Sequence, residues 1–161
     1  MKWNENDAPY RIRFAYKDEW NEIIALVWKT FLRFEAPDYS REGIKNFNDF
    51  ITDHTLFRMF EKGYYRVMVA LEEKQIVGVI SVRDSSHISL LFVAENVHKR
   101  GLGKRLIEEM VQYLLSEEGI TRITVNSSPY ALDFYRKIGF RDIGFEQLSG
   151  GIRFTPMELY L

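Results

Sequence analysis

The pattern of apolar and polar positions divides the chain into segments with two different periods. Alternation with a period of two, or a short apolar run between turn residues, predicts a strand. On this basis we expect strands at residues 10–15, 64–71, 76–82, 87–93, 122–126, 140–146 and 154–161. The polar residues EEKQ join the second and third of these strands, which predicts a hairpin. Residues 54–63 fit neither period.

Apolar residues at helical spacing predict helices in four other segments. We expect these helices at residues 18–34, 40–51, 102–119 and 128–139. The first two begin at residues that can cap them, Asp18 and Ser40. The fourth begins with Ser128 and Pro129, an N-cap followed by the residue favoured at the first helical position. Gly139 is placed to end it.

The order of these elements predicts the fold class. Antiparallel strands come first and later strands alternate with helices, a pattern typical of a mixed sheet with helices on both faces. We therefore expect an α/β (α+β) fold whose sheet is mixed and mostly antiparallel. Because no internal repeat or low-complexity linker interrupts the chain, residues 1–161 are expected to form a single domain with its own core.

Composition excludes several classes of function. The chain has 22 Lys and Arg against 23 Asp and Glu, and this balance argues against general nucleic-acid binding. It has no cysteine, which excludes disulfides, thiolate metal sites and cysteine nucleophiles. Its three histidines lack a metal-binding spacing, so we expect no metal. We recognise neither a signal peptide nor an apolar run of roughly 20 residues, and predict a cytoplasmic protein with no membrane partner.

One stretch carries a local excess of positive charge. VHKRGLGKRL, residues 97–106, places two glycines among four cations where a predicted strand leads into a predicted helix. Free N–H groups and the helix dipole favour an anion at a helix start, and glycines let a phosphate approach the backbone. The spacing matches neither a Walker loop nor a dinucleotide-binding fingerprint. Taken alone, the stretch also describes a tight turn with a solvated basic face.

The surrounding residues add a family resemblance. Residues 93–103, VAENVHKRGLG, resemble the acyl-CoA-binding motif of the GCN5-related N-acetyltransferase (GNAT) superfamily, Gln/Arg-x-x-Gly-x-Gly/Ala after an apolar strand. Gly101 and Gly103 match that motif, and His98 stands at the Gln/Arg position. This departure affects phosphate binding little, because such a loop binds mainly through its backbone N–H groups.

A second signature of the same superfamily lies downstream. SPYALDFYRKIGF, residues 128–140, resembles Asn-x-x-Ala-x3-Tyr-x3-Gly-Phe through Ala131, Tyr135, Gly139 and Phe140, with Ser128 where Asn is common. The ending GIRFTPMEL also looks like that of bacterial members. The resemblance is specific from about residue 76 to the end of the chain.

The resemblance implies acetyl-CoA as cosubstrate and a central pair of strands that splay to admit its pantetheine arm. The pyrophosphate is expected on the N–H groups of residues 99–104, with an N–H near Val93 polarising the thioester carbonyl. Asn126 either contacts the pantetheine or only ends a strand. The expected cofactor-binding residues are Phe92, Val93, Ala94, His98, Lys99, Arg100, Gly101, Leu102, Gly103, Lys104, Asn126 and Tyr135.

The resemblance also implies catalytic roles. Tyr135 matches the tyrosine that protonates the departing CoA thiolate, although its periodicity with Phe134 and Ile138 is equally that of a core residue. A protonated amine must lose a proton before it attacks, and Glu35 and Glu95 are the candidate bases. Both carboxylates also fit solvated loop positions. We expect His54 and His87 to be surface or packing residues.

Two functions of different classes follow. The first is an N-acetyltransferase that moves the acetyl group of acetyl-CoA directly to a primary amine in a ternary complex. The second is a non-catalytic acyl-CoA-binding or sensor module of the same fold. Tyr135 favours the first, because a binding module needs no acid for a thiolate. The acceptor, a small-molecule or peptide amine, stays open, as does a homodimer.

Overall fold

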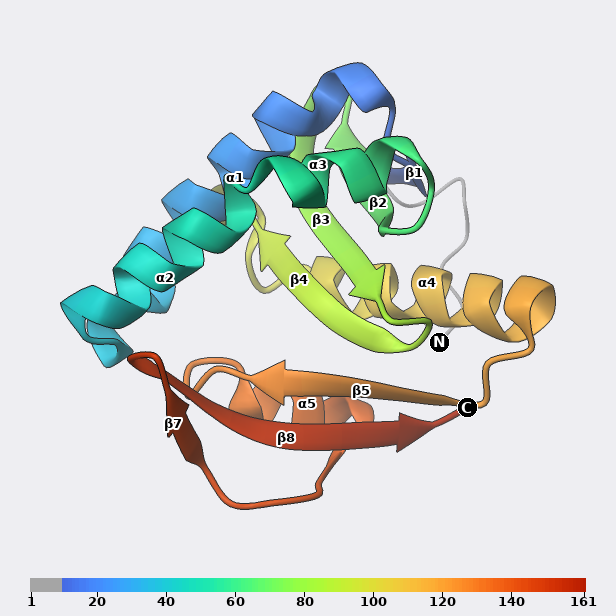
Figure 1. Cartoon of the computed structure of the whole chain (residues 1–161). Helices are drawn as coiled ribbons and strands as arrows, with labels where there is room; N and C mark the ends of the chain where they lie inside the picture. Colours follow the sequence, from blue (N-terminus) through green and yellow to red (C-terminus); the bar gives the residue numbers. More distant parts are fainter. Residues whose placement is uncertain (1–9) are drawn as a thin grey trace.

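The computed structural model describes residues 10–161, and the expectation about a targeting segment at residues 1–9 lies outside this range. Its sheet has the strand order β1-β2-β3-β4-β5-β8-β6, and β7 pairs with β8 (Figure 1). The strands are β1 (Tyr10–Phe14), β2 (Arg66–Glu72), β3 (Gln75–Arg83), β4 (His87–Val93), β5 (Arg122–Ser127), β6 (Arg141–Asp142), β7 (Gln147–Ser149) and β8 (Ile152–Tyr160). The helices are α1 (Trp20–Phe34), α2 (Arg41–Ile51), α3 (His54–Glu61), α4 (Leu102–Glu118) and α5 (Leu132–Ile138), with 3-10 turns η1 (Lys17–Glu19), η2 (Ala36–Asp38) and η3 (Glu95–Val97).

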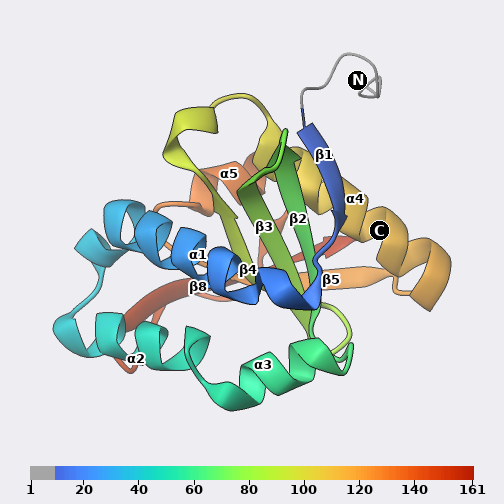
Figure 2. The ribbon, with the colours of Figure 1, turned by 90° about the horizontal axis from the view of Figure 1, so that it is seen from above.

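The helices cover both faces of the sheet (Figure 2). On one face α1, α2 and α3 bury a core that includes Ile23, Val27 and Phe31, the apolar stripe of α1. On the other face α4 and α5 bury a second core that includes Leu106 and Met110. The expected mixed sheet with helices on both faces is therefore confirmed.

The parallel contact between β4 and β5 is the irregular point of this sheet. The two strands pair only at His87 with Thr124 and at Ile88 with Val125, while the neighbouring pairs are antiparallel and longer. Beyond Ile88 the strands diverge, as Figure 1 shows. The central pair is thus splayed, as the family resemblance implied, and residues 90–93 keep ladder partners on the β3 side only within the described sheet.

Two boundaries near the end of the chain differ from the sequence prediction. The fourth helix begins at Leu132 and not at Pro129, because residues 129–131 form a turn in which the Ser128 hydroxyl accepts a hydrogen bond from the Ala131 N–H at 3.2 Å. The strand expected at 140–146 is reduced to β6, and the separate short strand β7 follows it; the residues of both are exposed and bury nothing against the core.

The ambiguous segment 54–63 is helical over most of its length. Asp53 caps α3 by accepting a hydrogen bond from the Thr55 N–H at 2.8 Å. Leu56 and Phe60 then bury themselves against the first core. A cap and two anchoring side chains suffice to fix a helix too short to be stable alone.

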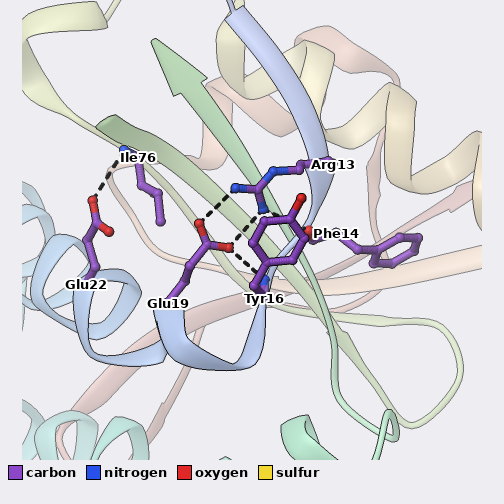
Figure 3. A network of polar contacts seen from close by, with 6 residues as sticks. All are labelled: Arg13, Phe14, Tyr16, Glu19, Glu22 and Ile76. Atoms are coloured by element: carbon purple, nitrogen blue, oxygen red, sulfur yellow. Dashed lines mark hydrogen bonds and ion pairs between the residues drawn. The ribbon is translucent and has the colours of Figure 1, made fainter. Parts of the chain in front are cut away.

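A polar network fixes the junction between β1 and α1 (Figure 3). Both guanidinium nitrogens of Arg13 donate to the Glu19 carboxylate, at 2.8 and 2.9 Å, and the Tyr16 N–H donates to it at 2.6 Å. The hydrogen bonds from Arg13 lower the pKa of Glu19. One turn further, Glu22 accepts from the Ile76 N–H of β3 at 3.4 Å. The start of α1 is thereby held on the sheet, which determines where its C-terminal end lies.

Candidate active site

A cavity of about 650 Å³ lies where β4 and β5 part. Its wall is made of β4 and β5, of α1, α2 and the two residues that flank η2 on one face of the sheet, and of α4 and α5 on the other. The cavity therefore reaches both faces through the splay. We call the part lined by α4, α5 and the glycine loop the loop end, and the part lined by α1, α2, the residues that flank η2 and the turn at 128–131 the helix end.

The glycine loop at 98–103 forms one wall of the loop end. Lys99 and Gly101 have left-handed backbone angles, with φ of 63° and 75°, and Gly101 is the N-cap of α4. In residues 10–161 no side chain caps this helix, so the N–H groups of its first turn are free to bind an anion. Gly101, Leu102 and Gly103 all line the cavity. The anion site predicted from the sequence is thus next to the cavity.

Gly103 has a packing reason of its own. A Cβ at this position would lie 3.0 Å from Cζ of Phe134 on α5 and 3.9 Å from Val93. A side chain at this position would require the Phe134 ring to shift, so glycine permits the first turn of α4 to lie close to this ring of α5.

His98 fixes the path of the loop. Its Nε2 lies 2.7 Å from the Val93 carbonyl oxygen, and since a carbonyl only accepts, Nε2 carries the proton and donates. The His98 ring also packs on Phe34 at a centroid distance of 4.7 Å. At the Gln/Arg position of the motif, histidine thus contributes a backbone hydrogen bond and an aromatic contact with α1.

The four cations of the loop point in different directions. Lys99 lines the cavity. Arg100 donates to the Tyr10 hydroxyl at 2.8 Å and Arg105 to the Tyr10 carbonyl at 2.9 Å, which ties α4 to β1. Lys104 is exposed and faces Glu108, one helical turn on, at 3.9 Å. Lys137 of α5 also lines the cavity, a cation that sequence reasoning missed.

The backbone of β4 offers a free donor to the cavity. The Ala94 N–H donates to the Val77 carbonyl at 2.8 Å, so it points toward β3. Since successive residues of a strand alternate in direction, the N–H and carbonyl of Val93 point away from β3 into the splay. The His98 contact with the Val93 carbonyl agrees with this orientation. Phe92 and Val93 both line the cavity.

Glu35 lies at the helix end, on the residue that follows α1. The Ser128 hydroxyl donates to its Oε1 at 3.1 Å, which joins the end of α1 to the turn before α5. Burial raises the pKa of Glu35 to about 7, with the Ser128 hydrogen bond lowering it and the charge of Asp38 raising it by smaller amounts. A carboxyl with this pKa can both accept and release a proton near neutral pH.

Tyr135 is a packed core side chain that also reaches the cavity. Its side chain is only 5% exposed and packs edge-on against Phe134 and Phe140, each at 5.2 Å. It also lines the cavity. Burial, and then the charge of Glu35, raise the pKa of its phenol, so the hydroxyl keeps its proton. Glu35 lines the same cavity.

Three other predicted residues lie outside the wall of this cavity. Glu95 is exposed and forms an ion pair with Arg33 at 3.5 Å. Together with Ala94 it lines a separate depression beside α1. Asn126 is exposed and sits opposite Pro156 in the β5–β8 ladder. Of the two carboxylates proposed as base, the structure brings only Glu35 together with Tyr135.

Sequence reasoning missed most of the aromatic side chains at the helix end, where Phe34, Tyr39, Phe47, Phe92 and Tyr130 line the cavity. They come from five separate segments of the chain, so no local spacing connects them. Ser128 was expected only as a helix cap, and its hydrogen bond to Glu35 spans 93 residues. The one available signal was the density of aromatic residues around Glu35.

The remaining histidines take structural positions. His87 Nδ1 lies 2.8 Å from the Thr124 hydroxyl, at the point where β4 and β5 still pair, and burial lowers its pKa. His54 packs near Phe57, with ring centroids 6.1 Å apart. Within residues 10–161 we find no group of three or more metal-binding side chains, and no helix with the length and apolarity to cross a membrane.

Several solved structures share this fold. A GCN5-related N-acetyltransferase from Rhodopseudomonas palustris superposes with a TM-score of 0.80 at 23% identity, covering 94% of this chain and 95% of that one. The PaiA N-acetyltransferase of Thermoplasma acidophilum, in complex with coenzyme A, gives 0.78 at 17% identity, covering 94% and 99%. The spermidine/spermine N-acetyltransferase SpeG of Vibrio cholerae gives 0.65 at 14% identity, covering 94% of each chain. At these identities the likeness concerns the fold.

The family itself follows from the sequence. Residues 35–161 match the family model of the acetyltransferase (GNAT) domain, which is most of the chain and includes both motifs as well as Glu35. The chain belongs to the GNAT family of acetyltransferases.

Proposed function

We propose that this protein transfers the acetyl group of acetyl-CoA to a primary amine by direct attack within a ternary complex. The observation that carries the proposal is the placement of Glu35 and Tyr135 in one cavity, on opposite faces of a splayed β4–β5 pair. A proton acceptor and a proton donor then flank the splay, where both substrates can meet. Bound acetyl-CoA supplies the acetyl group as a thioester whose leaving group is a thiolate.

Two features of the loop end support binding of the coenzyme there. The free N–H groups at the start of α4 bind the pyrophosphate, and Lys99 and Lys137 add positive charge. The pantetheine arm lies along β4, where the splay leaves backbone groups unpaired in the described sheet. His98 takes part indirectly, by holding the Val93 carbonyl and with it the loop.

The chemical step needs three contributions from the chain. Glu35 accepts one proton from the ammonium, which leaves the neutral amine free to attack the thioester carbon. The Val93 N–H donates to the carbonyl oxygen as negative charge develops there. As the new C–N bond forms and the C–S bond breaks, Tyr135 gives its proton to the sulfur, and the second proton of the nitrogen restores the Tyr135 phenol through water. The proton held by Glu35 then passes to solvent, which returns both side chains to their starting states. The products are an amide and CoA with a free thiol.

The raised pKa of Glu35 suits a general base. A base with a pKa of about 7 is half ionised at neutral pH and binds the proton of an amine better than an ordinary carboxylate does. Burial keeps the Tyr135 phenol protonated, so that a proton donor is present in the cavity, although the raised pKa makes it a weaker acid than a phenol in water. The alternative, a binding module without turnover, gives no reason for either group to line the cavity.

Release of free thiol from acetyl-CoA in the presence of amines tests the proposal. We expect kcat/KM of the wild type to fall tenfold per pH unit below about pH 7, where Glu35 becomes protonated. Glu35→Gln keeps the oxygen that accepts from Ser128 but removes the base, and kcat should fall on the order of 10²-fold.

Glu95→Gln is the matched control, because Glu95 is exposed and lies outside the cavity wall. It should leave both kcat and the pH profile unchanged. Equal activity of Glu35→Gln and the wild type would remove Glu35 from the mechanism. Binding of acetyl-CoA with no thiol release for any amine would favour the binding module.

A further inference from the structure

The helix end of the cavity is lined mainly by aromatic rings. Phe34, Tyr39, Phe47, Phe92 and Tyr130 line this end together with Glu35. Phe34 stacks on Tyr130 at a centroid distance of 5.1 Å, and Phe47 lies 6.0 Å from Phe92. Flat apolar groups bind between such rings, because each ring offers a large area and a preferred stacking or edge contact.

Negative charge at the helix end is limited to one group. Of the residues that line the cavity, Glu35 is the only acidic one, whereas Lys99 and Lys137 line its other end. Asp38 acts on the pKa of Glu35 and Tyr39 from outside the lining, and Arg153 opposes it at Tyr39. A second ammonium group on an acceptor would enter an aromatic environment without a carboxylate partner, at a high cost in desolvation.

From this distribution we propose that the acceptor is a primary amine with a single positive charge on an aromatic body. Its ammonium lies against Glu35, and its ring stacks among Phe34, Phe47 and Tyr130. Polyamines and other polycations are poor substrates, because only one of their charges finds a partner. This inference rests on the proposed function, whose acceptor site it describes.

Substitution of Tyr130 tests this acceptor site most directly. It is 53% exposed on a turn, so its removal leaves the core intact, yet its ring stacks on Phe34 and lines the cavity. Tyr64 is 70% exposed and lies in the segment between α3 and β2, outside the cavity lining. Tyr64→Ala is therefore a matched control for Tyr130→Ala.

The test compares three amines by thiol release from acetyl-CoA: 2-phenylethylamine, n-butylamine and spermidine. For the wild type we expect kcat/KM to be highest for 2-phenylethylamine, on the order of tenfold above n-butylamine and more above spermidine. Tyr130→Ala should lower the value for 2-phenylethylamine about three- to tenfold while changing that for n-butylamine less than twofold. Tyr64→Ala should change neither.

Two other outcomes separate this inference from the proposed function. A higher kcat/KM for spermidine than for 2-phenylethylamine would overturn the aromatic monoamine while leaving the acetyltransferase in place. If no amine gives thiol release, calorimetry on the protein saturated with CoA measures the affinity of each of the three amines. Tighter binding of 2-phenylethylamine without thiol release would then support the substrate class and overturn the function, whereas equal binding of all three amines would overturn the class.

Discussion

The two ends of the cavity are built in different ways. At the loop end the binding groups are mostly backbone: free N–H groups at the start of α4, two left-handed residues, and the N–H of Val93. At the helix end they are side chains, Glu35 and a set of aromatic rings, brought in by α1, α2, the residues that flank η2 and the turn at 128–131. Backbone groups recognise what any acyl-CoA presents, whereas side chains can change without disturbing the fold. The loop end is therefore suited to a common cosubstrate and the helix end to a particular acceptor.

Tyr135 lies where the two ends meet, and its substitution should give the largest effect. Tyr135→Phe keeps the ring and its contacts with Phe134 and Phe140 but removes the proton donor. We expect kcat to fall about 10²-fold or more, with little change in acetyl-CoA affinity. The free energy of unfolding should change by no more than about 1 kcal/mol.

Steady-state kinetics and thermal melts on Tyr135→Phe and Tyr135→Ala decide between the two roles of this residue. If Tyr135 only packs, the phenylalanine variant keeps its turnover and only the alanine variant is damaged. That result would leave protonation of the thiolate to water or another side chain.

The loop end should be sensitive to backbone geometry. Gly101→Val forces a β-branched residue into a left-handed conformation, which costs about 1–2 kcal/mol and displaces the N–H groups around it. We expect the Kd of acetyl-CoA, measured by calorimetry, to rise about tenfold or more.

Gly119 at the other end of α4 supplies the control. It is also left-handed, with φ of 65° and open space around its Cα, so Gly119→Val introduces the same strain away from the cavity. This variant should lose similar stability and keep its affinity. Equal affinities for Gly101→Val and the wild type would place the coenzyme elsewhere.

At the helix end, Glu35 should make the free energy of unfolding depend on pH. Folding raises the pKa of Glu35 from an ordinary 4.5 to about 7, so the native state binds this proton more tightly than the unfolded state does. The stabilisation of the folded state by this proton is fully present below pH 4.5, and it is lost as the pH rises to about 7. Glu35→Gln avoids this loss and should be more stable than the wild type by about 1–3 kcal/mol above pH 7.

Denaturant unfolding at pH 4 and pH 8 measures this difference. The stabilisation by Glu35→Gln should be close to zero at pH 4, where the wild-type carboxyl is protonated in both states. The Glu95→Gln variant should show no such difference between the two pH values. A Glu35→Gln variant less stable than the wild type at pH 8 would mean that the carboxylate is well solvated or paired in the native state.

The difference between the two ends also explains which features could be predicted from the sequence. The loop end was recognisable because left-handed backbone and close helix contact require glycine at fixed spacing, as at Gly101 and Gly103. The splay followed from the family resemblance, and the strand expected at 87–93 has the bounds of β4. The cofactor contacts themselves stay predictions.

What escaped prediction depends on contacts between distant segments. Glu35 was one of two equal candidates until Ser128, 93 residues away, was seen to bind it. The side chain of Arg100 was expected to face a phosphate, yet it donates to Tyr10 at the other end of the chain. The start of α5 was placed too early because the Ser128 hydroxyl caps a turn and contacts Glu35 as well.

Removing a cation of the loop should have the smallest effect on the Kd of acetyl-CoA. This experiment compares binding by side-chain charge with binding by backbone N–H groups. Lys99→Asn removes a charge from the cavity wall with a residue that tolerates the left-handed conformation, and Lys104→Ala removes a charge that faces Glu108. We expect the Kd of acetyl-CoA to rise about two- to fivefold for Lys99→Asn and less than twofold for Lys104→Ala, because exposed charges contribute little.

Salt dependence adds a second measurement of the same effect. Screening at about 1 M salt shortens the range of such charges to about 3 Å, so the difference between Lys99→Asn and the wild type should shrink there. The effect of Gly101→Val should persist, since it acts through the position of N–H groups. If Lys104→Ala weakened binding more than Lys99→Asn, the phosphates would lie along the outer face of α4, and the loop end would bind chiefly through side-chain charge.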